Sequence, residues 1–72
     1  MPDQELVEFK VSVSAEVALQ LAQFCKRSTY ETFLNFTEPH LSVEERKRRA
    51  AQMIDGVDAV ARGLADAGFR PR

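Results

Sequence analysis

Apolar and polar residues alternate near the start of the chain. The apolar positions are Val7, Phe9, Val11 and Val13. The polar positions between them are Glu8, Lys10 and Ser12. A period of two that is rich in β-branched residues is typical of a strand with one buried face. We therefore predict a strand at residues 6–13, preceded by a frayed polar stretch at residues 1–5.

A helical period replaces this alternation after Ser14, which is a favourable N-cap residue. One face of the next segment carries Val17, Leu21, Phe24 and Cys25. This spacing predicts a helix at residues 15–27. Ser28 and Glu31 then fit a capping box, and the apolar phase changes at the same place. We expect a separate short helix at residues 29–36, with one kinked helix through both segments as the alternative.

The C-terminal half contains the longest apolar stripe. Pro39 favours a loop, and Ser42 with Glu45 fits a second capping box after it. The helix that follows carries seven apolar residues on one face: Ala50, Met53, Ile54, Val57, Val60, Ala61 and Leu64. Gly68 suits the left-handed position that ends many helices. We therefore predict a long helix at residues 42–67.

A single predicted strand leaves its backbone groups unpaired on both edges. No second segment of the sequence is a convincing strand, so we expect residues 6–13 to pair antiparallel with a second copy across a twofold axis. The four apolar strand residues would then lie in the dimer interface. The predicted fold class is α+β, with one domain over residues 1–72 in an intertwined dimer. The long helix packs either within its own chain or across the dimer.

The residue composition limits the kinds of binding site and activity that we expect. A chain of 72 residues with a net charge of −1 has no general attraction for nucleic acid or anionic membranes. Cys25 is the single cysteine and His40 the single histidine, so we expect neither a disulfide nor a metal site. The sequence contains no glycine-rich phosphate loop and no nucleophile beside a base. We expect a protein without enzyme activity or cofactor, stabilised by oligomerisation.

Signals for membranes and export are missing from the pattern. The N-terminus reads Met1-Pro2-Asp3-Gln4-Glu5, which is acidic and lacks the apolar core of a signal peptide. No apolar run approaches the roughly 20 residues that span a bilayer. We expect a cytoplasmic protein with no membrane partner.

The predicted order of strand, helix and helix over residues 6–37 resembles the ribbon-helix-helix architecture. In that family the outward-facing strand residues read bases in the major groove, which implies this role for Glu8, Lys10 and Ser12. Because Glu8 and the net charge of −1 oppose contact with phosphates, a DNA-binding regulator is the alternative function.

A second resemblance rests on two short segments, LAQFCKR at residues 21–27 and LADAGFRPR at residues 64–72. They resemble small uncharacterised proteins of proteobacterial prophages and plasmids, which share an LAQF-x-KR segment and a C-terminal Ala-Gly-aromatic-x-Pro-Arg sequence. The resemblance implies a mobile-element origin. Proteins of that kind often bind and inhibit a host protein, such as a transcription activator, a motor ATPase or a defence complex.

Several residues are candidates for contact with a partner. Three aromatic residues crowd the short predicted helix: Tyr30, Phe33 and Phe36. They either close the core or, where exposed, anchor a partner. Leu19 falls opposite the predicted buried face of its helix and is a further exposed candidate. Three cations near the start of the long helix either form a solvated, salt-bridged turn or meet an anionic partner: Arg46, Lys47 and Arg49.

Gly56 and Gly63 lie seven residues apart in the long predicted helix. They either allow a second helix of the dimer to approach closely or are tolerated surface positions. From these observations we expect a non-enzymatic, homodimeric protein-interaction module, encoded by a phage or mobile element, that inhibits a host bacterial protein. A structural subunit of a larger complex is the third hypothesis.

Overall fold

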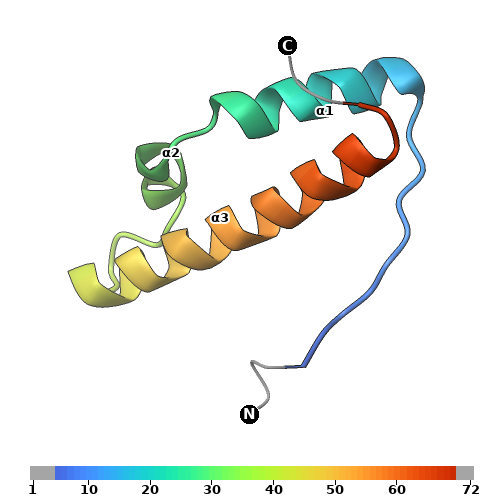
Figure 1. Ribbon diagram of the computed structural model, residues 1–72. Helices are drawn as coiled ribbons and strands as arrows, with labels where there is room; N and C mark the ends of the chain where they lie inside the picture. Colours follow the sequence, from blue (N-terminus) through green and yellow to red (C-terminus); the bar gives the residue numbers. More distant parts are fainter. Residues whose placement is uncertain (1–4, 70–72) are drawn as a thin grey trace.

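The computed structural model describes residues 5–69 and is all helical over that range. Three helices follow one another, α1 (Ala15–Arg27), α2 (Tyr30–Asn35) and α3 (Val43–Asp66). In Figure 1, α1 and α2 lie along one side of α3. The boundaries predicted from the sequence lie within one residue of those observed at both ends of each helix.

Local side chains explain where α1 and α2 begin and end. The Ser14 hydroxyl accepts a hydrogen bond of 3.2 Å from the Val17 N–H, so the predicted N-cap is confirmed. Ser28 has extended backbone angles, φ −72° and ψ 143°, and separates the two helices, so the single kinked helix is wrong. The capping box of α2 is formed one residue later than predicted, between Thr29 and Thr32.

The ends of α3 follow the same logic. The Ser42 hydroxyl accepts from the Glu45 N–H at 3.2 Å, as the predicted N-cap requires. At the other end Gly68 adopts a left-handed φ of +96°. The Phe69 N–H then reaches the Leu64 carbonyl at 2.8 Å, which is the Schellman pattern of hydrogen bonds.

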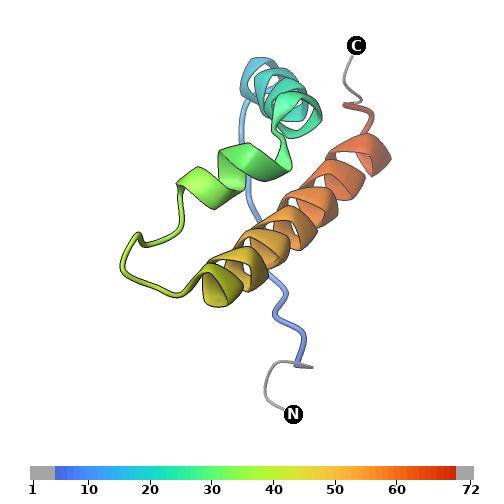
Figure 2. The ribbon, with the colours of Figure 1, turned by 90° about the vertical axis from the view of Figure 1, so that its left-hand side faces the viewer.

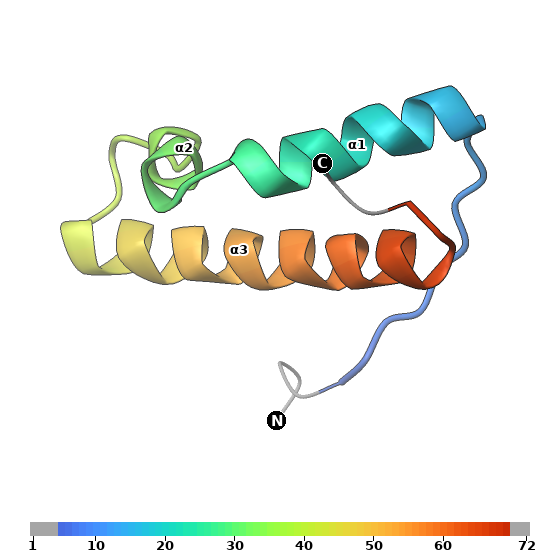
Figure 3. The ribbon, with the colours of Figure 1, turned by 45° about the horizontal axis from the view of Figure 1, so that its top comes forward.

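The core is made mostly of alanines. Four apolar residues are buried: Ala18, Ala22, Phe33 and Ala50. Ala18 and Ala22 are the buried residues of α1, which packs against α3, and Figures 2 and 3 show α1 and α2 on the same long helix. Phe33 is the single large apolar side chain buried among the described residues.

The apolar face predicted for α1 is rotated in the structure. Val17 and Phe24 were expected in the core but are 52% and 49% exposed, while Ala18 and Ala22 are buried. Two alanines four residues apart let α1 approach α3 closely, and the larger side chains move to the flank of the contact. Leu19, expected on the exposed side, is half-buried.

The predicted strand is wrong, and with it the α+β class and the ribbon-helix-helix likeness. Residues 5–14 form no helix or strand and run away from α1 in an open, drawn-out path (Figure 1). None of the backbone hydrogen bonds recorded between described residues involves residues 5–13. Alternation makes an extended conformation favourable, but a strand also needs a second backbone to pair with, and the described chain supplies none.

Candidate functional site

Residues 5–14, which we term the N-terminal arm, are exposed along their whole length. Leu6, Val7 and Phe9 are 89%, 81% and 75% exposed. Val11 and Val13 are exposed as well. Such a row of uncovered apolar side chains is unfavourable in water and typical of an interaction segment. The arm therefore contains the four residues that we expected in a dimer interface, Val7, Phe9, Val11 and Val13, without the strand that was to carry them.

The exposed apolar surface continues onto α1. Val17 and Phe24 lie seven residues apart, on one side of the helix, and half-buried Leu21 lies between them. We call these three residues the α1 stripe. Sequence reasoning placed them in the core; the pair Ala18 and Ala22 was the signal that could have shown a different side facing α3.

The molecule is open for its size. The radius of gyration is 14.0 Å, against about 11 Å for a compact chain of this length. The accessible surface is 6086 Å², about 1,600 Å² more than the ~4,500 Å² expected for a mass of 8.1 kDa. Its dimensions of 39, 28 and 15 Å describe a flat molecule. A second molecule can therefore cover much of one face.

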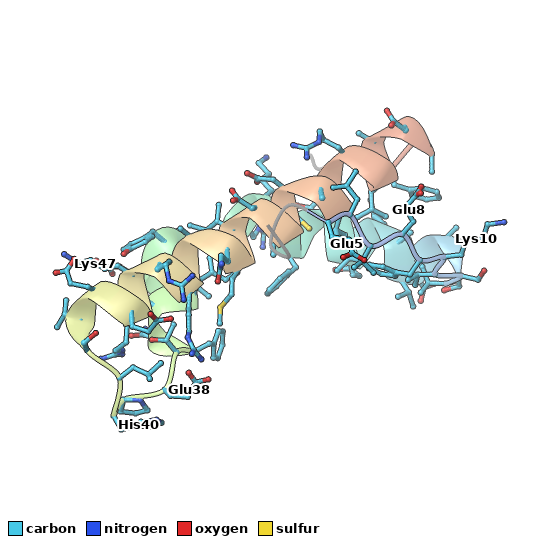
Figure 4. The ribbon with its side chains drawn as sticks, turned by 90° about the horizontal axis from the view of Figure 1, so that it is seen from below. Glu5, Glu8, Lys10, Glu38, His40 and Lys47 are labelled. Carbon is cyan, nitrogen blue, oxygen red and sulfur yellow. The ribbon has the colours of Figure 1, made fainter. Side chains whose placement is uncertain are left out.

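A separate apolar surface lies around α2. Phe36 is 69% exposed and Tyr30 is 42% exposed, whereas Phe33 between them is buried. In Figure 4, Glu38, His40 and Lys47 lie at one end of the molecule, Glu8 and Lys10 lie toward the other end, and Glu5 lies between them, nearer the middle. We refer to Tyr30 and Phe36 as the aromatic pair.

Arg46 joins α3 to the end of α2. Its Nε donates to the Thr37 hydroxyl at 2.8 Å, and its NH2 group donates to the Leu34 carbonyl at 3.3 Å. Thr37 is buried and donates its own hydroxyl proton to the same Leu34 carbonyl at 2.6 Å. The guanidinium of this candidate partner residue thus holds two helices together within one chain.

The remaining cations of the run behave differently from one another. Glu45 accepts from Arg48 at 2.6 Å and from Arg49 at 2.9 Å, and Arg49 also pairs with Glu38 at 3.0 Å. These hydrogen bonds lower the pKa of the Glu45 carboxyl and raise the pKa of Arg49. Lys47 is exposed.

Glu38, Arg48 and Arg49 also line a shallow depression of about 470 Å³, together with Gln52 and Met53. Opposite charges are already paired on its floor, so it offers no concentrated field for an anion.

Neither glycine of α3 contacts another helix. Gly56 and Gly63 are exposed, and a Cβ placed on either would meet no atom within 4 Å.

The three polar residues expected to read DNA bases, Glu8, Lys10 and Ser12, are exposed along the arm. Because no strand holds them on one face within the described residues, the base-reading ribbon that motivated the DNA hypothesis is wrong.

Cys25 is half-buried on α1. Burial raises the pKa of its thiol above the ordinary value, and the nearby negative charge of Asp58 raises it further. A raised pKa leaves little reactive thiolate at neutral pH.

Residues 5–69 contain no group of three or more acidic, histidine or cysteine side chains placed to hold a metal ion. None of the three helices is both long and apolar enough to cross a membrane.

The geometry defines a small all-helical protein with large exposed apolar surfaces. Comparison with protein families places all of residues 1–72 in a family of unknown function, DUF7706, and the chain belongs to this family. No curated protein and no solved structure matches the chain.

Proposed function

We propose that the chain is a non-enzymatic protein-interaction module that forms a homodimer and binds a host bacterial protein, whose activity it inhibits. The observation that carries the proposal is the imbalance of apolar side chains. Eleven large apolar or aromatic residues are at least 39% exposed in residues 5–69, while Phe33 is the one that is buried. Exposed apolar surface in this amount supports binding to another protein.

The aromatic pair is the proposed contact for the host protein. Aromatic side chains that are held by a rigid helix and exposed at their tips dominate the binding free energy of many interfaces. Phe36 follows directly after α2, which is fixed to α3 by Arg46, so it is presented from a supported position. The partner that fits is a protein with an apolar pocket for Phe36 and an acidic rim for Lys47.

The proposal of a host partner is also supported by the resemblance of two segments, LAQFCKR and the C-terminal LADAGFRPR, to prophage and plasmid proteins. A mobile-element origin is the proposal that this resemblance supports. A protein of that origin would act inside a bacterial cell, where the proteins available to it are those of the host.

Affinity capture with matched variants tests the proposal. The tagged chain is expressed in a bacterium as wild type, as Phe36→Ser and as Val60→Ser. The Val60→Ser control removes an exposed apolar side chain from α3, away from the aromatic pair. We expect one protein at stoichiometric yield with wild type and Val60→Ser, and at least ~10-fold less with Phe36→Ser. The activity of the captured protein should fall on addition of wild type.

Two results would contradict the proposed host contact. One is the absence of any stoichiometric partner. The other is equal capture by wild type and Phe36→Ser, which would remove the aromatic pair from the interface.

A further inference from the structure

We propose that the N-terminal arm of each copy lies along the α1 stripe of a second copy, so that two chains exchange arms. The inference rests on the homodimer of the proposed function and assigns its interface. The arm contributes Val7, Phe9, Val11 and Val13, and the receiving surface is the α1 stripe, Val17, Leu21 and Phe24. Contact is made through side chains against a helix.

The arm has no route back to its own α1. Ser14 alone separates Val13 from Ala15, the first residue of the helix, and its angles of φ −65° and ψ 158° are extended. Reversal of the chain direction takes a turn of about four residues, commonly with glycine or proline, and none is present here. The arm therefore leaves α1 at its start, and the α1 stripe is open to another molecule.

The arm is long enough to cover the α1 stripe, which extends over seven residues, or about 10 Å, within α1. From Val7 to Val13 an extended chain advances six steps of about 3.3 Å, or about 20 Å. The 13 residues of α1 rise about 1.5 Å each, which is also about 20 Å. One arm therefore spans one α1 helix. Alternation turns the four apolar arm residues toward the helix and leaves Glu8, Lys10 and Ser12 in solvent.

The surplus surface identifies the occupant as a second copy. Each chain exposes about 1,600 Å² beyond the expectation for its mass, so a dimer that covers this surplus buries about 3,200 Å² in total. Permanent homodimers bury about 2,000–5,000 Å². A twofold interface needs both complementary surfaces on one chain, and this chain carries the arm and the stripe that fits it.

Adjacent arm residues provide a matched test. Val11→Asp places a charge on the apolar side of the arm, and Ser12→Asp places the same charge one residue further on, on the polar side. Sedimentation velocity of the full chain should show twice the 8.1 kDa monomer mass for wild type and for Ser12→Asp. For Val11→Asp we expect monomer, with the dissociation constant raised at least ~100-fold, because the buried charge has no partner.

Paramagnetic relaxation then locates the arm. A spin label is attached at Glu8→Cys in a Cys25→Ala background and mixed with unlabelled, ¹⁵N-enriched wild type. Arm exchange predicts line broadening at the amides of Val17, Leu21 and Phe24 of the enriched copy. Broadening at the partner's residues 6–13 instead would mean that two arms pair with each other, and it would overturn the inference.

The outcomes separate this inference from the proposed function. A wild-type dimer that persists in Val11→Asp overturns arm exchange and leaves the homodimer in place. A wild-type chain that is monomeric at about 100 µM overturns both arm exchange and the homodimer. Capture of a host protein through Phe36 is measured independently of either result.

Discussion

At the scale of single residues, the buried hydroxyl of Thr37 and the guanidinium of Arg46 carry the most specific contact in the molecule. Thr37 is 3% exposed, and its buried hydroxyl both donates and accepts a hydrogen bond. Sequence reasoning saw Arg46 only as a member of a cationic run, because a contact between residues nine positions apart across a loop leaves no local pattern.

Replacement of Arg46 should weaken the junction of α2 and α3. Arg46→Gln removes the bonds to Thr37 and the Leu34 carbonyl, and we expect the free energy of unfolding to fall by about 1–2 kcal/mol. Lys47→Gln, at the exposed neighbouring position, should change it by less than about 0.5 kcal/mol. Urea unfolding followed by circular dichroism measures both. Equal effects from the two variants would show that the Arg46 contacts contribute nothing.

The thiol of Cys25 gives a second prediction at this scale. Its pKa is raised by burial and by Asp58, so alkylation by iodoacetamide should become fast only above the pH at which an ordinary thiol reacts. Asp58→Asn removes a negative charge that opposes ionisation, and the midpoint of the pH–rate profile should move down. Asp55→Asn is the control and should leave the midpoint in place. A downward shift with both variants would contradict a specific effect of Asp58.

At the scale of elements, the helices were predictable and the arm was not. Ser14, Ser42 and Gly68 are local signals whose hydrogen bonds lie within four or five residues, so they can be read from the sequence. The alternation of residues 6–13 indicates an extended chain equally well, and pairing with another strand depends on a distant backbone. The orientation of α1 depends on α3, and periodicity alone cannot show which of two adjacent faces is buried.

Gly63 within α3 and Gly68 just beyond its end should respond in opposite ways to alanine. Gly68→Ala forces a Cβ into a left-handed conformation of φ +96°, which should lower the free energy of unfolding by about 1 kcal/mol. Gly63→Ala adds a Cβ that meets nothing within 4 Å in a helix, and it should raise stability by about 0.5–1 kcal/mol. Thermal unfolding measures the pair. Destabilisation by Gly63→Ala would show that a second helix packs against that glycine, as the close-approach hypothesis requires.

At the scale of the whole molecule, α1 and α2 pack against α3 around a small core, in which three of the four buried apolar residues are alanines. So small a core only narrowly offsets the conformational entropy lost when a 72-residue chain folds. A chain with so little buried apolar surface needs a further source of stability. Cys25 has no cysteine partner and the described residues form no metal cluster. The sequence pointed to oligomerisation for the same reason, although through a strand that is not there.

The dependence of the melting temperature on protein concentration tests this account most directly, since a core completed by a second copy couples folding to association. Between 1 and 100 µM, a hundredfold range, the account predicts that the melting temperature of the full chain rises by about 5 °C or more. A melting temperature that is the same at every concentration in this range would show that one chain completes its own fold, and would contradict the account.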